Sequence, residues 1–389
     1  MALGNIIPQQ TKPLCKYFGT CGGCSTQHVP YAVQLENKKQ RIISALKKNN
    51  IPVPAQIHIH SGEPYFYRNR MDFLFTAKGL GLRMKVNPGA ILPVDECVIA
   101  NKKVNELLAE VQRWFLEHTQ QLDLKTLAFV IIRAAEHTAS SAIVFVLSES
   151  STKHAAHTAL IEQFAQHTTA ENVILGFLSG SADNDVQDCY AVKGSLVMKE
   201  RLCDVPITFS SFSFFQNNTQ MAEQMIRHCA AFFVTQNIDK ATLLDLYGGA
   251  GTFGLSFAHQ FARTIIMDTK GPNIMCAEQA GKAMNLRNLH IVRADAKTLA
   301  RHARTLGLHT LNQQLFVITD PPRIGMDQKA IKALLDLSPK AIIYISCNPM
   351  QMTKELKRFM KQYTLASLAL FDLFPQTNHI EAIAVLQKK

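Results

Sequence analysis

The sequence has no long hydrophobic run. Hydrophobic residues fill 47% of its 389 positions, yet no apolar stretch approaches the roughly 18 to 20 residues that a membrane-spanning helix needs. The first residues also lack the charged and then apolar layout of a secretory signal peptide. We therefore expect a protein with no membrane partner that works in the cytoplasm.

Repeats of fixed period and low-complexity tracts are missing too, so domain limits must be inferred from changes of pattern. At 389 residues the chain is too long for one ordinary core. Three zones emerge, at 1–103, 104–205 and 206–389. The first contains close cysteines and a basic helix candidate, "YAVQLENKKQRIISALKK", and the second mixes helix and strand patterns, which predicts a central α+β domain.

Acidic residues are the minority charge. The formal net charge is +11, with 41 Lys and Arg against 30 Asp and Glu. The first and third zones are basic, with 14 against 5 and 20 against 12, whereas the second is acidic, with 7 against 13. Such a balance suits a polyanion, most simply nucleic acid held through its phosphates. The basic bands "KKQR" and "YRNR" are candidate RNA surfaces, although a charge run is often only a solvated face.

The nine cysteines should stay reduced in a cytoplasmic chain, so a disulfide framework is not expected. Five of them stand singly. The other four, Cys15, Cys21, Cys24 and Cys97, form the spacing C-x5-C-x2-C with a distant fourth member. Four thiolates suit zinc or an iron–sulfur cluster, and the spacing alone does not choose between them. The spacing differs from the C-x3-C-x2-C of radical enzymes, which argues against radical chemistry.

The third zone has a regular pattern in which apolar runs alternate with segments of helical length and period. The runs are "TLLDLY", "TIIMD", "LHIVRA", "LFVITD" and "AIIYIS". This alternation predicts an α/β domain with a parallel sheet and crossover helices. Two further runs, "LASLALFDLF" and "IEAIAVL", have only a short break between them. They predict an antiparallel hairpin, because a parallel pair needs a crossover of about a dozen residues.

A glycine loop follows the first of these strands. In "DLYGGAGTFGL", Gly249, Gly251 and Gly254 form a G-x-G-x-x-G, and Asp268 ends the next strand, 19 positions beyond Gly249. Glycines let the backbone approach a ligand, and a carboxylate at that spacing can bind ribose hydroxyls. A nucleoside cofactor is expected, but NAD and S-adenosylmethionine both present a ribose diol. A glycine-rich turn without a ligand is the alternative.

Three more polar residues are expected at the same rim of the sheet. Asp320 in "DPPRIG" follows the fourth strand and Cys347 in "SCNP" follows the fifth, while Glu381 lies near the start of the last, antiparallel strand. With the strand order 3-2-1-4-5, these positions meet at the carboxyl ends of the strands, where ligands bind in such sheets. Taken singly, Cys347 reads as a buried apolar side chain and Glu381 as an exposed strand-end carboxylate. Their coincidence favours catalysis.

A thiol, a carboxylate and a nucleoside cofactor together suit methylation of uracil. A thiolate that attacks carbon 6 makes an enolate whose carbon 5 can take a methyl group, and a base then removes the proton at carbon 5. The target base must leave its stack, and aromatic and amide side chains usually hold it. Phe214 and Gln216 in "FSFFQNN" offer such side chains on one face of an extended segment, although that stretch alone is also typical of a strand end before a helix.

These residues together resemble the RNA uridine-5 methyltransferases, through "CKYFGTCGGCSTQH", "SFFQNN", "DLYGGAGTFGL", "DPPRIG", "YISCNP" and "LFDLFPQTNHIEAIAVL". The resemblance implies a class I Rossmann-like methyltransferase domain with a seven-stranded sheet of the type 3-2-1-4-5-7-6. It implies that Cys347 is the nucleophile, that Glu381 is the base and that Phe214, Gln216 and Asp320 position the uracil.

The resemblance also implies the cofactors. Contacts with S-adenosylmethionine are expected from Gln216, Tyr247, Gly249, Gly251, Thr252, Asp268, Asp295 and Asp320. The four N-terminal cysteines resemble the ligands of a structural 4Fe–4S cluster in one branch of the family, with zinc as the alternative. This chain departs from the family at Gly248, where cysteine is frequent, and at Asp268, where glutamate is usual.

The expected activity is therefore C5 methylation of a uridine in a structured RNA, with 23S ribosomal RNA favoured and uridine 54 of tRNA as the alternative. We expect a monomer without an obligate protein partner. Two other classes remain open. An NAD-dependent oxidoreductase would share the glycine loop but leave Cys347 and Glu381 without roles, and a non-catalytic RNA-binding protein would keep its RNA affinity after Cys347→Ala.

Overall fold

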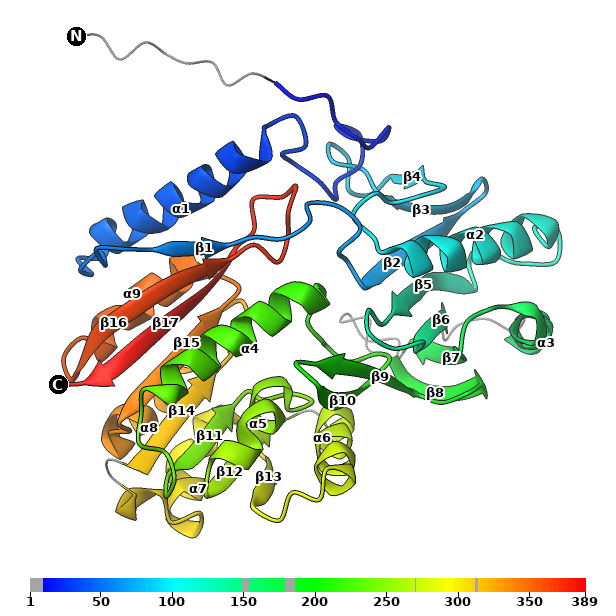
Figure 1. Cartoon of the computed structure of the whole chain (residues 1–389). Coiled ribbons are helices and arrows are strands. Elements are labelled where there is room, and N and C mark those ends of the chain that lie inside the picture. Colours follow the sequence, from blue (N-terminus) through cyan, green and yellow to red (C-terminus); the bar gives the residue numbers. More distant parts are fainter. Residues whose placement is uncertain (1–9, 149–153, 179–185, 270, 312–313) are drawn as a thin grey trace, which may run out of the picture.

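The computed structural model describes residues 10–389 except 149–153, 179–185, 270 and 312–313. Two large sheets dominate it, one of eight strands and one of seven, and a two-stranded ribbon lies between them (Figure 1). Within these described residues, no helix has both the length and the apolar content needed to cross a membrane.

The eight-stranded sheet contains all the strands expected in the third zone. Its order is β1-β16-β17-β15-β14-β11-β12-β13. Its members are β1 (His58–His60), β11 (Thr242–Leu246), β12 (Arg263–Asp268), β13 (Leu289–Arg293), β14 (Leu315–Thr319), β15 (Ala341–Ser346), β16 (Tyr363–Phe371) and β17 (Glu381–Lys388). Counted from β11, seven strands stand in the order 3-2-1-4-5-7-6, and β16 and β17 form an antiparallel hairpin. The edge strand β1 is an addition that sequence analysis did not predict.

Helices cover both faces of this sheet. One face is packed by α4 (Thr219–Val234), α5 (Thr252–Phe257) and α6 (Gly271–Ala283). The other is packed by α1 (Tyr31–Lys48), α7 (Leu299–Thr305), α8 (Gln328–Leu337) and α9 (Pro349–Phe359). Successive strand residues alternate between the two cores, since Leu243 belongs to the same core as Phe233 of α4 and Leu244 to the same core as Ile331 of α8. Burial on both faces explains why these strands are almost continuously apolar.

The seven-stranded sheet has the order β4-β3-β2-β5-β6-β7-β8. Its strands are β2 (Arg70–Thr76), β3 (Gly79–Arg83), β4 (Ile91–Pro93), β5 (Leu127–Ala134), β6 (Ser141–Leu147), β7 (Asn172–Leu178) and β8 (Val186–Lys193), with helices α2 (Lys102–Glu117) and α3 (His154–His167). A third core lies between this sheet and the two helices. The ribbon consists of β9 (Val197–Leu202) and β10 (Val205–Ser210).

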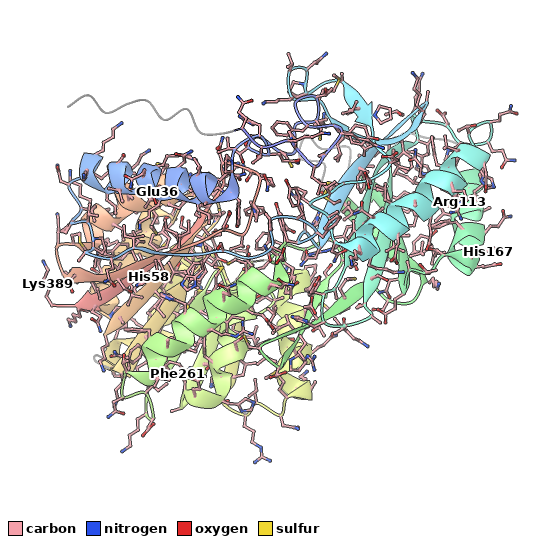
Figure 2. All side chains as sticks on the ribbon, turned by 45° about the horizontal axis from the view of Figure 1, so that its top comes forward. Glu36, His58, Arg113, His167, Phe261 and Lys389 are labelled. Carbon is pink, nitrogen blue, oxygen red and sulfur yellow. The ribbon has the colours of Figure 1, made fainter. Side chains whose placement is uncertain are left out.

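The first zone of the sequence is shared between the two sheets. β2 pairs with β5 in an antiparallel ladder, so the seven-stranded sheet contains strands from both sides of position 103. Position 103 itself lies in α2. In contrast, α1 and β1 join the eight-stranded sheet, and Figure 2 shows Glu36 and His58 on the lobe that also holds Lys389, far from Arg113 and His167 on the other lobe. Backbone pairing therefore divides residues 1–103, which sequence analysis took as one zone.

Candidate active site

The glycine loop, Asp320 and Cys347 lie at one rim of the eight-stranded sheet. β11, β14 and β15 are adjacent, and Leu246 and Thr319 are paired positions at the ends of the first two. The backbone N–H of Asp320 donates to the carbonyl of Leu246 at 3.3 Å. Cys347 directly follows the last residue of β15. This is the rim at which parallel strands of such sheets bind ligands.

Glu381 reaches the same rim from the antiparallel strand. The pairing of β15 with β17 runs from Ala341 opposite Gln387 to Ser346 opposite Ala382. One step further in this register, Cys347 lies opposite Glu381. Side chains at directly opposed positions of an antiparallel pair are neighbours on one face. The ladder between β15 and β17 therefore brings the proposed nucleophile and the proposed base together.

Two carboxylates surround the thiol. Burial, and then the charges of Glu381 and Asp320, raise the pKa of Cys347 to about 12, while Arg323 opposes the shift. Burial and then Asp320 hold the pKa of Glu381 well above its usual range. Burial also raises the pKa of Asp320 to about 7, against a hydrogen bond that favours its anion. The three groups therefore share one electrostatic field, and Cys347 holds its proton at neutral pH until a base accepts it.

Gln216 and Phe214 face different surroundings. Gln216 is buried, and its side-chain Nε2 donates to Asp320 Oδ2 at 3.2 Å. Its backbone carbonyl accepts from Asn69 Nδ2 at 2.9 Å. Phe214 is 58% exposed, whereas Phe215 is buried and stacks on Phe209 with 4.0 Å between ring centroids. Phe214 is therefore the ring of this pair that a flat ligand can reach, and Gln216 is the amide already directed at Asp320.

Arg133 of β5, which sequence analysis missed, holds the segment before Phe214. Its guanidinium is buried and donates to the carbonyls of Ser211 at 3.1 Å and Ser213 at 2.7 Å. The same group lies 4.8 Å from the ring centroid of Phe209. The only signal in the sequence is one arginine within the apolar run "LAFVIIRA".

The glycine loop has the backbone expected of a ligand-binding turn. Tyr247, Gly249 and Gly251 all have positive φ, and Gly251 precedes Thr252, the first residue of α5. The backbone N–H of Gly249 donates to Asp268 Oδ2 at 2.9 Å. Turn and carboxylate are thus joined directly beside the carboxyl ends of β11 and β12.

Asp245, in the middle of the apolar run before the loop, is a second residue that sequence analysis missed. It is fully buried, its Oδ2 accepts from the N–H of Gly254 at 2.7 Å, and burial raises its pKa to about 8. A Cβ at Gly248 would lie 2.8 Å from this same Oδ2 and 2.7 Å from Ile266 Cγ2. A side chain at position 248 would therefore require Asp245 or Ile266 to shift.

Asp295 follows β13 and caps a short 3₁₀ turn. Its Oδ1 accepts from the backbone N–H of Lys297 at 2.9 Å, and its Oδ2 pairs with Lys297 Nζ at 2.8 Å. The lysine lowers the pKa of the Asp295 carboxyl. A cofactor contact at Asp295 would have to compete with this ion pair.

The turn after Asp320 is held by α9. Glu355 of α9 is buried and accepts from Tyr344 Oη at 2.6 Å and from the N–H of Met326 at 3.2 Å. Gly325 has φ +90°, and a Cβ there would overlap Glu355 Oε1. Ile324 in the same turn is 83% exposed. The turn is therefore a stiff projection beside the rim.

The four N-terminal cysteines line one cavity of about 1170 Å³. Cys15, Cys24 and Cys97 pack around the same small apolar cluster, and burial raises the pKa of Cys24 to about 12. Across the described ranges, no group of three or more His, Cys, Asp or Glu side chains is arranged to hold a metal ion. Four thiols at one cavity match the donor chemistry of both zinc and an iron–sulfur cluster, and the lining does not choose between them.

The same cavity is basic and lies between the sheets. Its cationic lining residues are Arg68, Arg70, Arg83, Lys85 and Arg293. Arg70 pairs with Asp72 at 2.9 Å, and Phe212 and Ser213, just before Phe214, complete the wall. Arg68 and Arg70 of "YRNR" line this cavity, and RNA contact there stays a prediction. For "KKQR" the expectation of an RNA surface is wrong at Lys38, which is buried in an ion pair with Asp372.

Comparisons with known proteins bear on this site. The sequence model of the tRNA (uracil-5-)-methyltransferase family matches residues 30–389. The tRNA (uracil(54)-C(5))-methyltransferase of Pyrococcus abyssi is 27% identical over 384 residues, which cover 97% of this chain and 87% of that protein. An uncharacterized RNA methyltransferase of Listeria monocytogenes is 26% identical over 98% of this chain and 85% of its own length.

A solved structure shows the same fold. The crystal structure of the Pyrococcus abyssi tRNA (uracil-54, C5)-methyltransferase in complex with S-adenosyl-L-homocysteine matches with a TM-score of 0.74 and 24% sequence identity. The match covers 94% of this chain and 85% of that one. Fold and family together define a class of enzyme, the S-adenosylmethionine-dependent methyltransferases that modify C5 of uracil in RNA.

Within this class, the chain belongs to the tRNA (uracil-5-)-methyltransferase family, whose model spans all but its first 29 residues. It is an RNA (uracil-5-)-methyltransferase. This family assignment replaces the two alternative classes from sequence analysis, an oxidoreductase and a non-catalytic RNA-binding protein.

Proposed function

We propose that the enzyme methylates its target uridine through a covalent bond between Cys347 and carbon 6 of the base. The observation that carries the proposal is the register of β15 and β17, which sets Cys347 opposite Glu381 with Asp320 beside them. All these residues come from one chain, so the proposed site needs neither a second copy nor a protein partner.

The chemistry follows from the groups present. The Cys347 thiol loses its proton to Asp320, which leaves Glu381 free for the later step, and it forms a carbon–sulfur bond at carbon 6 while the electron pair moves to the enolate. S-adenosylmethionine, when bound, supplies the electrophilic methyl group that carbon 5 takes. Glu381 then removes the proton from carbon 5, the carbon–sulfur bond breaks and the thiolate leaves. The raised pKa of Glu381 makes it a stronger base than an exposed glutamate once it is ionised.

The target base is held by side chains at the same rim. Phe214 offers an exposed ring for stacking, while Gln216 and Asp320 form a hydrogen-bonded pair that can present donor and acceptor atoms to the uracil edge. S-adenosylmethionine is proposed to lie along the glycine loop, with its ribose at Asp268. Its further contacts are proposed at Gln216, Tyr247, Gly249, Gly251, Thr252, Asp295 and Asp320.

The RNA is proposed to enter over the basic cavity between the sheets, because its cations lie beside the Phe212 and Ser213 wall that leads to Phe214. Sequence analysis favoured 23S ribosomal RNA, and this stays a prediction. The named relatives act on uracil 54 of tRNA, and the cysteines do not separate the two substrates. We therefore propose tRNA as the first RNA to test, with 23S rRNA beside it.

The four N-terminal cysteines are proposed to hold a structural 4Fe–4S cluster. Iron and acid-labile sulfide should co-purify with the protein under anaerobic conditions, and Cys97→Ser should lower both. Cys189→Ser, in the central sheet, is the matched control and should lower neither. If zinc co-purifies instead of iron and sulfide, the proposal of a 4Fe–4S cluster is wrong and the four cysteines bind zinc.

The test of the covalent route offers the protein S-adenosylmethionine and total RNA that contains 5-fluorouridine, because fluorine at carbon 5 cannot be removed as a proton after methylation. A protein–RNA adduct that survives denaturation is expected with the native chain and with Cys189→Ala. It should be absent with Cys347→Ala. Failure of the native chain to form an adduct with any RNA would contradict the proposal, and sequencing the trapped RNA names the substrate.

A further inference from the structure

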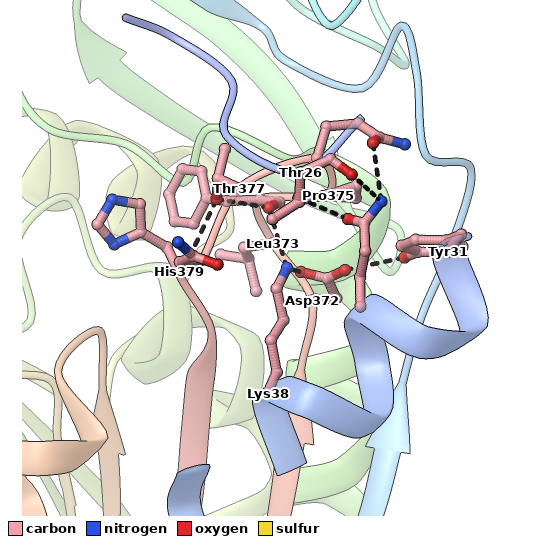
Figure 3. Close-up of polar contacts among 12 residues, drawn as sticks. Thr26, Tyr31, Lys38, Asp372, Leu373, Pro375, Thr377 and His379 are labelled. Carbon is pink, nitrogen blue, oxygen red and sulfur yellow. Dashed lines mark hydrogen bonds and ion pairs between the residues drawn. The ribbon is translucent and has the colours of Figure 1, made fainter. Parts of the chain in front are cut away.

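The loop that leads into Glu381 is held by residues from the other end of the chain. This loop, residues 372–380, joins β16 to β17, and Glu381 is the first residue of β17, paired with Phe371. Lys38 of α1 forms an ion pair with Asp372 at 2.6 Å between its Nζ and Oδ1 (Figure 3). Tyr31, also on α1, donates its hydroxyl to Asp372 Oδ2 at 3.0 Å.

The ion pair is removed from water. The side chains of Lys38 and Asp372 are 3% and 0% exposed. Lys38 Nζ makes a second bond, to the carbonyl of Phe374 at 3.2 Å, so the lysine binds both the start and the third residue of the loop. Buried ion pairs are often no more stabilising than apolar residues of the same size. A buried ion pair does, however, require its two charged groups to keep a fixed distance and orientation. It can therefore fix the position of the loop relative to α1.

A second set of bonds holds the middle of the loop. Gln34 Nε2 donates to Gln376 Oε1 at 2.9 Å, and the backbone N–H groups of Ser25 and Thr26 donate to the carbonyl of Gln376 at 2.9 and 3.1 Å. Gln376 has φ +67°, a conformation that residues other than glycine rarely adopt. The contacts from α1 and from the segment after Cys24 therefore hold the loop in a backbone shape that it would not keep by itself.

We propose that Lys38 and Asp372 are positioning residues for the general base Glu381. The inference rests on the proposed function, since it needs Glu381 to remove the proton at carbon 5. Asp372 directly follows Phe371, the partner of Glu381, at the end of the hairpin. If the loop shifts, Glu381 loses its place opposite Cys347 while the thiol at the end of β15 keeps its own.

A displaced base has a distinct chemical consequence. Cys347 still forms its bond to carbon 6 and carbon 5 still takes the methyl group, since neither step needs Glu381 at carbon 5. The proton at carbon 5 then stays, so no electron pair is released to expel the thiolate. The protein should remain joined to methylated RNA, and release should become the slow step.

The experiment compares Lys38→Met with Lys47→Met, an exposed lysine changed in the same way on the same helix. The probes are in vitro transcripts of tRNA and of 23S rRNA with ordinary uridine, and S-adenosylmethionine with a radiolabelled methyl group. Lys38→Met should accumulate labelled protein–RNA adduct on a denaturing gel and lose turnover by about tenfold or more, a part of the roughly 10²–10⁴-fold that a well-placed general base contributes. Lys47→Met should release its product as the native chain does.

Adduct formation with 5-fluorouridine RNA separates positioning from loss of folding, because it does not need the base. Lys38→Met should form this adduct at nearly the native rate. Equal losses of the 5-fluorouridine adduct and of turnover, or native release from ordinary RNA, would overturn the inference. If Lys38→Met does not fold, Tyr31→Phe, which removes only one hydrogen bond to Asp372, decides. Slowed release then supports the inference, and native release overturns it.

The two proposals fail in different ways. If the native chain forms no 5-fluorouridine adduct, the covalent route itself is wrong. If it forms one and Lys38→Met releases RNA normally, only the role of Lys38 and Asp372 is wrong.

Discussion

At the scale of single residues, the state of Cys347 is set by its neighbours. Burial is the largest cause of its raised pKa, and the charge of Glu381 is the next. A negative neighbour disfavours the thiolate, so removing that charge must lower the pKa of the thiol. The nucleophile and the base are therefore coupled before any substrate binds.

Glu381→Gln should lower the pKa of Cys347. The effect should appear above the raised pKa of Glu381, where the native side chain is charged. The measurement is the rate at which iodoacetamide alkylates the Cys347 peptide between pH 6 and about 11, followed by mass spectrometry. The profile should move to lower pH in Glu381→Gln and stay in place in Glu117→Gln, an exposed control. An unmoved profile would show that the two groups do not interact.

Gly325→Ala should disrupt the turn after Asp320. Any L-residue at φ +90° is strained by about 1–2 kcal/mol, and here the methyl group would also displace the hydrogen-bonded Glu355, at a further cost of about 1–3 kcal/mol. Gly307→Ala is a matched control, with φ +65° and nothing within 4 Å of the new Cβ. Thermal unfolding and methyl transfer should both be impaired more in Gly325→Ala. Equal effects would assign the whole cost to backbone strain.

Residues that interrupt an apolar pattern at a strand end were predictable from the sequence, and Cys347, Asp320 and Glu381 are of this kind. Asp245 and Arg133 were not, because each lies within a buried strand run and its partners, Gly254 and the carbonyls of 211 and 213, are distant or belong to the backbone. Sequence patterns reveal where a polar side chain stands. They do not reveal which buried carbonyl it binds.

At the scale of elements, length decided what could be predicted. The helix α1 coincides with the segment "YAVQLENKKQRIISALKK", because its apolar residues Ile42 and Leu46 recur at helical spacing and pack into the core. The strand β1 has only three residues, "HIH", which are too few to show a period. Its pairing with β16 depends on the rest of the sheet.

Arg133→Met should destabilise the contact between β5 and the segment 210–213. The change removes the donors of two buried carbonyls, which costs about 3 kcal/mol when they stay unpaired. The urea midpoint should fall accordingly, whereas Arg113→Met, at an exposed position of α2, should stay within about 0.5 kcal/mol of the native value. Methyl transfer should also fall in Arg133→Met, since Phe214 follows this segment. Full activity in a destabilised variant would separate the segment from base binding.

At the scale of the whole molecule, charge and topology combine. The two basic zones of the sequence meet at the cavity between the sheets, where Arg68 and Arg83 from the first zone face Arg293 from the third. The charge distribution was visible in the sequence. The place where the two basic zones come together was not, since it depends on the pairing of β2 to β4 with β5 to β8 in the seven-stranded sheet.

Arg83→Gln should weaken RNA binding mainly through the phosphates. The expected result is a lower affinity for every RNA tested and a fall of about one in the slope of log affinity against log salt. Arg113→Gln, at an exposed position of α2 outside the cavity lining (Figure 2), should leave the slope unchanged. Filter binding from low to high salt measures both. A loss of affinity with an unchanged slope would mean that Arg83 does not contact a phosphate.

The register of β15 and β17 also determines which changes of length the gene can tolerate. Side chains alternate between the two faces of a strand, so one residue inserted into or deleted from either strand would turn Cys347 or Glu381 away from its partner. The loop at 372–380 lies outside that ladder, and its limits come from α1 instead. Insertions and deletions in natural variants should therefore avoid β15 and β17 and accumulate in the surface connections of the seven-stranded sheet.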